Sequence, residues 1–445
     1  MGIDCLLVST NQVINPYPVY PLGVACLIGA MEAAGHSTRH YDVLARGGVD
    51  LLRDWLISSP PDLVGLSIRN LDTVDSTAPD SFIGSVTEIM SVVRQYTTAP
   101  VVLGGPAFSI MPEEVMELLK ADYGIVGEGE ILLPWLADQL DRGRPPAEKI
   151  LRAVPSPNPW SRVCFDKATV EYYLGLGGML NVQTKRGCPY RCAYCSYPTL
   201  EGRQYRLQDP EKVVETVMRA TRDFGARYIF FTDSVFNDAQ GHYLKVAEAL
   251  LRAGNTTPWC AFFRPEGLER DGLELLKQAG LSAMELGTDA ASDTTLAGLN
   301  KGFNFAEVIR ANDLAVDLGL PCAHFIIFGG PGEDADTLAQ GIDNVARLKH
   351  SVVFPFTGIR ILPGTDMAAR ALADGVITPG HSLLAPVFYF SPLISAPEID
   401  GALRRAWTGR FDRVYPASSM EERSRRLHQR GHIGPMWDYL ISQRG

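Results

Sequence analysis

The sequence lacks two features that would define its surroundings. No stretch approaches the roughly 18 consecutive apolar residues of a transmembrane helix. Positive charge is not in excess either, because 51 acidic residues against 41 lysines and arginines give a net charge of −10. Nucleic-acid binding needs a basic face, so we expect neither nucleic acid nor a membrane span. The first residues carry no basic flank or cleavage site of a secretory signal, and we expect a cytoplasmic monomer.

Cysteine is scarce and mostly scattered. Eight cysteines in 445 residues do not make a disulfide framework. A structural zinc site usually takes two separated pairs of ligands, and no second C-x2-C pair is present. Five cysteines mostly lie in apolar surroundings, where a free cysteine packs as a small hydrophobe: Cys5, Cys26, Cys164, Cys260 and Cys322.

The other three cysteines form the most informative motif of the chain. Cys188, Cys192 and Cys195 have the spacing C-x3-C-x2-C. Three thiolates can hold three irons of a [4Fe–4S] cube and leave the fourth iron without a protein ligand. A metal with an open position can chelate a small molecule. The motif therefore predicts an iron–sulfur cluster that takes part in catalysis.

Strands and helices alternate in two blocks, so we expect an α/β protein. Residues 1–140 have the pattern of a doubly wound, Rossmann-like domain, with glycines where two strands end. Residues 141–178 are expected to be a linker because prolines cluster there. Residues 179–374 contain six strand–helix units, which predict a partial (β/α)6 barrel. The cysteine motif follows the first of these strands, at the carboxyl face where such barrels hold their active sites.

The last block, residues 375–445, is expected to be small and mainly helical. Residues 401–445 hold nine arginines against four acids. Two interpretations stay open: a lid that faces an anion, and a solvated helical surface.

The cysteine motif, its strand and the barrel together resemble the radical S-adenosylmethionine (SAM) superfamily. The resemblance implies that SAM chelates the open iron through its amino and carboxylate groups. Polar and glycine residues at later strand ends match positions that contact SAM in that family, although each alone is also typical of turns and caps. The residues expected at SAM are Tyr194, Thr232, Asp233, Ser234, Arg264, Glu285, Thr288, Gly329, Glu333 and Arg360.

The N-terminal block is similar to the cobalamin-binding domain of one radical SAM subfamily. The similar segments are Gly104-Gly105-Pro106 and Gly127-Glu128-Gly129-Glu130, each after an apolar strand. From the residues alone, a nucleotide site or a purely structural domain remains an alternative. The residues that we expect at cobalamin are Asn11, Ser67, Arg69, Gly104, Gly105, Gly127 and Glu128.

The sequence departs from many cobalamin proteins at the lower side of cobalt. The only histidine with a glycine at the D-x-H-x-x-G distance is His428, and Arg426 stands where the aspartate belongs. We therefore predict methylcobalamin without a histidine lower ligand. Arg69 is a candidate to face the lower side of the corrin, and a phosphate or carboxylate partner for Arg69 is the alternative.

The resemblance implies a class B methyltransferase-like enzyme. Cys188, Cys192 and Cys195 would be catalytic, and a flavodoxin- or ferredoxin-type partner would supply electrons. The expected reaction methylates an unactivated carbon of a small-molecule natural product or lipid. Three alternatives stay open: a cyclase, ring-contraction or other rearrangement enzyme, a non-radical methylcobalamin-dependent C-methyltransferase, and a non-catalytic cobalamin sensor. Residues that could face substrate, although packing is the commoner role, are His324, Tyr389, Phe390, His242 and His381.

Overall fold

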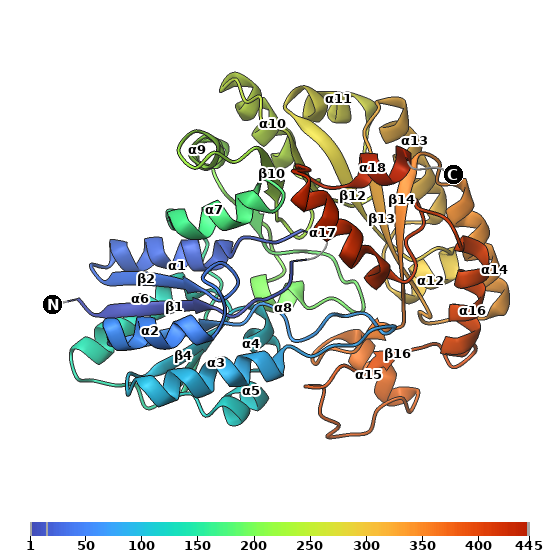
Figure 1. Ribbon diagram of the computed structural model, residues 1–445. Helices are drawn as coiled ribbons and strands as arrows, with labels where there is room; N and C mark the ends of the chain where they lie inside the picture. Colours follow the sequence, from blue (N-terminus) through green and yellow to red (C-terminus); the bar gives the residue numbers. More distant parts are fainter. Residues whose placement is uncertain (1, 15–16, 443–445) are drawn as a thin grey trace.

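The computed structural model describes residues 2–14 and 17–442. Its N-terminal part is a parallel sheet in the order β2-β1-β3-β4-β5-β6 (Figure 1). The strands are β1 (Asp4–Ser9), β2 (Ser37–Asp42), β3 (Leu63–Ser67), β4 (Val101–Gly104), β5 (Tyr123–Val126) and β6 (Ile150–Arg152). The strand order reverses between β1 and β3, and such switch points leave a crevice at the carboxyl edge of the sheet.

Helices cover both faces of this sheet, as expected for a doubly wound domain. Alternate β1 side chains point to opposite faces: Leu6 packs with α2 and α3, and Leu7 packs with α1 and α6. The helices are α1 (Leu22–Ala33), α2 (Asp50–Ser58), α3 (Ile83–Tyr96), α4 (Pro106–Ile110), α5 (Pro112–Leu119) and α6 (Gly129–Asp141).

The segment expected to be a linker contains two regular elements. β6 adds a strand to the sheet edge, where it pairs with β5 through Gly124, Ile125 and Val126. Helix α7 (Lys167–Gly175) begins at Asp166, whose carboxylate accepts a hydrogen bond from the Thr169 amide at 2.9 Å. The prolines lie between these two elements, so only the middle of the segment is irregular.

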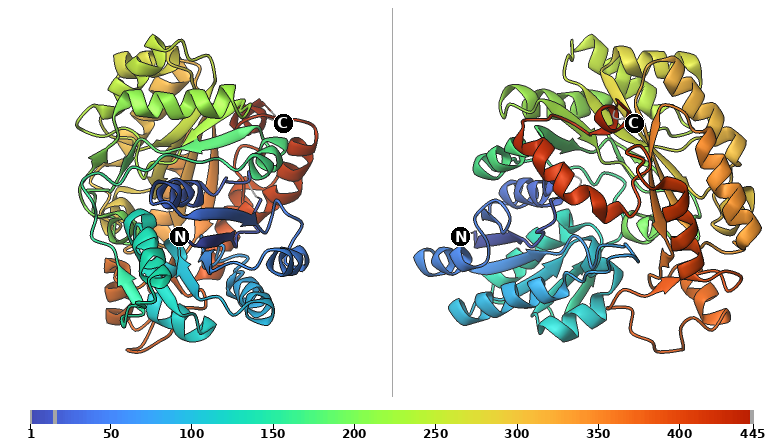
Figure 2. Two further views of the ribbon diagram at one scale, coloured as in Figure 1. Left: turned by 90° about the vertical axis from the view of Figure 1, so that its left-hand side faces the viewer. Right: turned by 45° about the vertical axis from the view of Figure 1, so that its right-hand side comes forward.

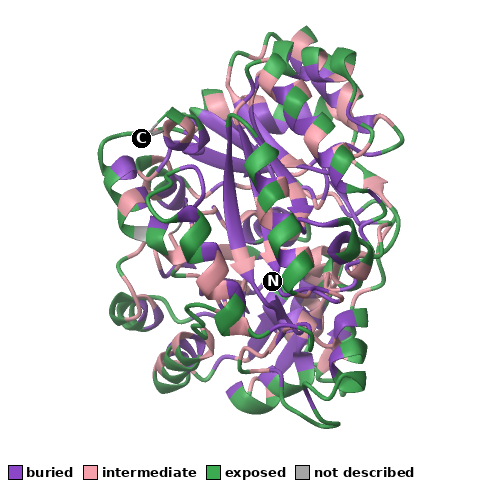
Figure 3. Cartoon of the chain, turned by 90° about the vertical axis from the view of Figure 1, so that its right-hand side faces the viewer, coloured by how far each residue is buried: buried purple, intermediate pink, exposed green. Residues whose placement is uncertain are grey.

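The second part is an open parallel barrel, which confirms the expected fold class. Its strand order is β14-β13-β12-β11-β10-β7, and β7 and β14 are the two edges. The strands are β7 (Met179–Val182), β10 (Tyr228–Phe231), β11 (Trp259–Phe263), β12 (Leu281–Asp289), β13 (Cys322–Phe328) and β14 (Ser351–Thr357). The outer helices are α9 (Pro210–Arg222), α10 (His242–Arg252), α11 (Arg270–Gln278), α12 (Asp293–Gly298), α13 (Phe305–Asp317) and α14 (Ala335–Arg347). Buried strands and outward-exposed helix faces are visible in Figure 3.

The C-terminal region is helical, and its last two helices lie across the opening between the two edges of the barrel (Figure 2). Trp437 packs on Phe354 of β14, with ring centroids 5.1 Å apart. At the other edge, the Gly434 amide donates to the Gly177 carbonyl, just before β7, at 3.0 Å. The tail therefore bridges both barrel edges, a role that neither interpretation of its arginines includes. Its helices are α16 (Ala396–Trp407), α17 (Glu421–Gln429) and α18 (Trp437–Ser442).

Within the described residues, no helix is both long and apolar enough to cross a membrane.

Candidate active site

The cysteine loop lies inside a small antiparallel hairpin at the carboxyl end of β7. The hairpin pairs β8 (Lys185–Arg186) with β9 (Arg206–Leu207), and α8 (Tyr197–Glu201) follows the third cysteine. Gly187 before the loop has φ +90°, and a Cβ there would lie 2.0 Å from the Gln204 carbonyl oxygen. Only glycine allows this approach, so the backbone itself fixes where the loop begins.

The three cysteines are free thiols that lie near one another. Cys192 acts electrostatically on Cys188, and both Cys192 and Cys188 act on Cys195. Burial raises the pKa of Cys188 and raises that of Cys195 to about 12. Among the described residues, no three His, Cys, Asp or Glu side chains converge as ligands of a single metal ion. A [4Fe–4S] cube does not require such convergence, because its cysteines bind different irons.

Two cations lie beside the Cys192 sulfur. Lys301 Nζ is 3.5 Å and Arg264 Nη1 is 4.0 Å from Cys192 Sγ. Arg264 is held by Glu266 at 3.0 Å, and its guanidinium stacks over the Tyr190 ring at 3.7 Å. Positive charge stabilises thiolates and a negatively charged cluster, so the donor set fits an iron–sulfur cluster. Lys301 was not predicted, since a lysine between two helices carries no recognisable motif.

Several residues expected at SAM surround the loop. Tyr194 is hydrogen-bonded to Asp289, which also pairs with Lys301. Ser234 Oγ donates to the Gly187 carbonyl at 3.1 Å, next to Cys188. Thr232 lies at the end of β10, where its amide donates to the Val182 carbonyl at 2.9 Å.

Asp233 bonds to several groups of the protein itself. It is fully buried and accepts hydrogen bonds from the Thr184 amide at 2.7 Å and the Lys185 amide at 3.2 Å. The buried Lys185 ammonium lies 3.3 Å from the same carboxylate. Asp233 thus positions the strand end that leads into the cysteine loop.

The residues expected at SAM at the end of β13 and after it bond to other groups of the protein. Glu333 accepts from the Gly329 and Gly330 amides, and burial raises its pKa to about 7. Arg360 of β15 (Ile359–Arg360) donates to Asp72 of the N-terminal domain at 2.7 Å and to the Leu383 carbonyl at 2.6 Å.

The Thr288 hydroxyl is directed to His324, 2.8 Å from its Nδ1, and Asn312 lies 3.1 Å from the other ring nitrogen. Burial lowers the pKa of His324 to about 3, so this histidine is neutral and packed. Glu285 faces the inside of the barrel and accepts from the Tyr17 hydroxyl at 3.0 Å.

The remaining candidates for substrate contact are dispersed. Tyr389 of β16 (Phe388–Tyr389) is buried and donates to Asp374 at 2.7 Å. Phe390 packs at Gly329 and Gly358, where added Cβ atoms would lie 2.8 and 2.5 Å from its ring. His242 is buried at the start of α10, whereas His381 is exposed in a loop.

The residues expected at cobalamin lie along the carboxyl edge of the N-terminal sheet. A hollow of about 10 Å³ at the β1/β3 switch point is lined by Thr10, Asn11, Gln12, Arg69, Asn70, Phe82, Ser85 and Val86. Ser67 ends β3 beside it and accepts from the Thr10 amide at 3.2 Å. A Cβ on Gly104 would meet only the Ile125 carbonyl, at 3.9 Å, so the edge there is open to a ligand. Gly105 has φ +93° and lets its turn approach Ile68. The polar side chains around the hollow and the open position at Gly104 are the groups at this edge that could contact a cofactor.

Arg69 has no ion pair with any described residue. Its guanidinium is half-buried, the groups that influence it are the phenols of Tyr197, Tyr173 and Tyr17, and burial lowers its pKa. A carboxylate partner, one of the two alternatives for Arg69, is thus missing among the described side chains.

Family comparisons agree with both halves of this site. The model of the radical SAM superfamily matches residues 182–343, and the model of the B12 binding domain matches residues 15–137. The chain belongs to the cobalamin-dependent radical SAM superfamily. The predictions of this family and of an enzyme are therefore confirmed.

Individual relatives are distant but cover most of the chain. A tryptophan 2-C-methyltransferase of Streptomyces laurentii is 27% identical over 84% of this chain and 75% of its own length. The hopanoid C-3 methylase of Methylococcus capsulatus is 27% identical over 68% of this chain and 60% of its own. The solved structure of the methyltransferase TsrM from Kitasatospora setae, with tryptophan and a SAM analogue bound, has a TM-score of 0.88 at 23% identity, covering 99% of this chain and 98% of that one.

Salt bridges join the two halves of the site. Both Glu128 oxygens accept from Arg206 of the cysteine hairpin, at 2.6 and 2.7 Å. Arg186 of the same hairpin donates to Glu130 at 2.6 Å. Gly127, with φ +85°, lies beside this contact. A Cβ added to it would be 3.9 Å from the Leu200 carbonyl oxygen of α8. The Glu128 side chain therefore holds the domains together, a role that its glycine-flanked position did not predict.

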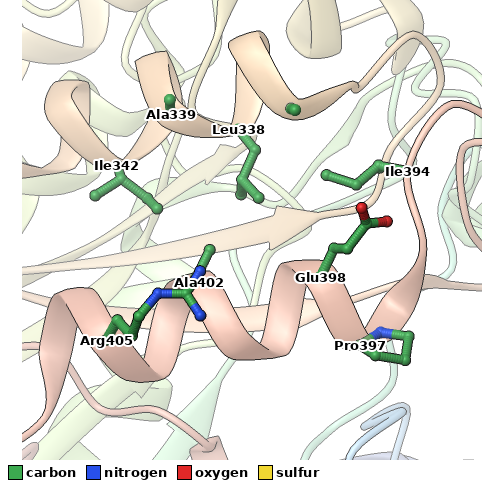
Figure 4. A pocket seen from close by; sticks show the side chains of 9 residues that line it. Leu338, Ala339, Ile342, Ile394, Pro397, Glu398, Ala402 and Arg405 are labelled. Atoms are coloured by element: carbon green, nitrogen blue, oxygen red, sulfur yellow. The ribbon is translucent and has the colours of Figure 1, made fainter.

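Away from the cysteine loop, an apolar groove of about 550 Å³ lies between α14 and α16 (Figure 4). It is lined by Leu338, Ile342, Ile394 and Ala402, with Arg405 at one end.

Proposed function

We propose that this protein uses a [4Fe–4S] cluster, SAM and cobalamin to methylate an unactivated carbon of a small-molecule natural product or lipid. The observation that carries the proposal is the docking of the two domains. The Arg206–Glu128 pair fixes the hairpin with the three cysteines against the β5–α6 turn of the cobalamin-binding sheet. This contact supports a cluster site and a cobalamin site that lie next to each other.

In this proposal Cys188, Cys192 and Cys195 are the cluster ligands. When bound, the cluster supplies an electron to SAM, and cobalamin supplies a methyl group. Lys301 and Arg264 would stabilise negative charge at Cys192. Tyr194, Thr232 and Ser234, which surround the cysteine loop, are the proposed contacts to SAM.

Arg69 is the proposed neighbour of the lower side of the corrin. In that position its guanidinium, which no described carboxylate neutralises, would disfavour water or another ligand to cobalt. We also propose a flavodoxin- or ferredoxin-type reductant, a monomer and a cytoplasmic location, which an oxygen-sensitive cluster favours.

The test is anaerobic reconstitution with iron, sulfide and cobalamin, followed by incubation with trideuteromethyl-SAM, a reductant and small-molecule extracts. We expect a product that carries the labelled methyl group and one 5′-deoxyadenosine per methyl transferred. A protein with alanines in place of Cys188, Cys192 and Cys195 is the control and should yield neither. A product without added mass, formed together with 5′-deoxyadenosine, would instead indicate a rearrangement enzyme.

A second candidate function is methylation without radical formation. The named product of the Streptomyces laurentii relative carries its methyl on C2 of tryptophan, an aromatic ring carbon, and this relative matches 84% of the chain. An electron-rich ring carbon can attack a methyl group directly, without loss of a hydrogen atom to a radical. Labelled product without 5′-deoxyadenosine would support this candidate.

A further inference from the structure

The inner face of the barrel is apolar apart from a few groups. Because side chains alternate along a strand, the residues that point inward can be followed around the sheet. Most are apolar, and many are aromatic: Phe230, Cys260, Phe262, Ala283, Ala323, Phe325, Ile327, Val352, Phe354 and Phe356. Glu285 on β12 brings a carboxyl group into this inner face.

Glu285 is only 1% exposed and has little compensation for its burial. Its one hydrogen bond to a described side chain comes from Tyr17, a residue of the N-terminal domain, at 3.0 Å. Among the described residues it has no ion pair with a lysine or arginine, and burial raises its pKa to about 8. A buried carboxylate without a cation is unfavourable in a folded protein, so the group stays protonated unless a cationic ligand supplies the missing charge.

The rings around Glu285 are suited to such a ligand. Phe262 of β11 lies directly opposite Glu285, and Phe325 lies two residues along β13 from Ala323, the neighbour of Glu285 on that strand. Both rings are half-buried although they point into the barrel. The faces of aromatic rings attract cations and pack against flat apolar groups. The rings thus form an apolar surface beside the Glu285 carboxyl group, which can accept a hydrogen bond.

The position of Glu285 separates it from the cluster. Asp289, four residues further along β12, is the residue that bonds Tyr194 and Lys301 at the cysteine loop. At about 3.3 Å per residue, Glu285 lies roughly 13 Å below that rim. SAM is expected at the rim, on the open iron, which leaves Glu285 to another molecule.

We propose that Glu285 binds the protonated amine of a substrate whose body is flat and apolar, with the inner phenylalanines against that body. The assignment deepens the proposed function, because it names the substrate class of the same reaction. Tyr17 holds the carboxyl in place and thereby links the cobalamin domain to substrate binding.

The experiment measures binding of three matched indoles by equilibrium dialysis. The holoprotein carries cluster, cobalamin and SAM, and no reductant is added. The probes are tryptamine, which is cationic, 3-ethylindole, which is neutral, and indole-3-propionate, which is anionic. We expect tryptamine to bind at least ~10-fold more tightly than the other two. Glu285→Gln should abolish the preference for tryptamine and leave the affinity for SAM unchanged. The control variant Glu248→Gln, on the outer helix α10, should keep the preference for tryptamine.

Three results would each overturn the proposal. Tryptamine and 3-ethylindole could bind equally tightly, neither could bind, or Glu285→Gln could leave the binding of tryptamine unchanged. A loss of SAM affinity in Glu285→Gln would also overturn it, because Glu285 would then serve SAM. If Glu285→Gln does not fold, Tyr17→Phe removes one hydroxyl and should weaken tryptamine about threefold without changing 3-ethylindole. Equal weakening of both probes would contradict the proposal.

The visible spectrum of the same sample reports the cofactors. Failure of the proposed function, with no cluster or cobalamin bound, is therefore distinguishable from failure of the amine preference.

Discussion

The Glu285→Gln variant should be more stable than the wild type, by a margin that grows as the pH rises. In the folded chain, burial raises the pKa of Glu285 from its ordinary 4.5 to about 8. Below pH 4.5 the group is protonated in both states and has no effect. Between the two pKa values the folded state binds more protons than the unfolded state, so stability falls with rising pH. A difference of about 3.5 between the pKa values corresponds to a loss of about 5 kcal/mol above pH 8.

Thermal unfolding of the cofactor-free protein at several pH values measures this effect. An unfolding entropy of about 2.1 cal/mol/K per residue gives about 0.9 kcal/mol/K for 445 residues. Glu285→Gln should therefore unfold about 5 °C higher than the wild type at pH 8.5 and at nearly the same temperature at pH 5. Glu248→Gln, on the exposed face of α10, should show no such trend. A difference in Tm that stays constant with pH, or that shrinks as pH rises, would refute the assignment of a buried, unpaired carboxyl.

Three further outcomes follow from the geometry of the site. Arg69→Ala should change the visible spectrum of bound cobalamin toward that of a form with water as a cobalt ligand, because on our proposal the Arg69 cation disfavours such a ligand. Lys301→Met should lower the reduction potential of the cluster by on the order of 100 mV, since a nearby unit charge contributes ~2 kcal/mol at an effective dielectric constant of about 20, as measured by redox titration. Arg206→Met should lower the free energy of unfolding by about 3 kcal/mol in urea titrations, because Glu128 then keeps only the more distant Arg186, at 3.5 Å.

Each of these outcomes has a matched control on the surface. Arg53→Ala should leave the cobalamin spectrum as it is, and Lys212→Met should leave the reduction potential unchanged, because both side chains are solvated. For the salt bridge, the double variant Arg206→Met, Glu128→Gln should recover part of the lost stability. Additive losses in the double variant would show that the two side chains do not interact.

Local motifs could be predicted from the sequence, because their chemistry depends on neighbours along the chain. The cysteine spacing alone indicates the cluster, and the glycines after β4 and β5 mark the edge of the cobalamin-binding sheet. The alternation of apolar strands and helices was sufficient to predict both α/β units. β6, with three residues, is too short for any periodicity to reveal it.

The contacts that join distant parts could not be predicted in this way. Tyr17 and Glu285 are 268 positions apart, and Arg360 and Asp72 are 288 apart. Both pairs exist only because the two domains dock, and a single sequence holds no record of that docking. For the same reason Arg360 and Glu128 were assigned to cofactors, whereas in the folded protein each forms an ion pair across the domain boundary.

The central claim is that Cys188, Cys192 and Cys195 hold a [4Fe–4S] cluster whose fourth iron binds SAM. Electron paramagnetic resonance of the reduced, reconstituted protein, recorded with and without SAM, tests it most directly. The account predicts the signal of a reduced [4Fe–4S] cluster that changes when SAM is added, and no such signal when the three cysteines are replaced by alanine. A signal that SAM leaves unchanged would contradict the claim.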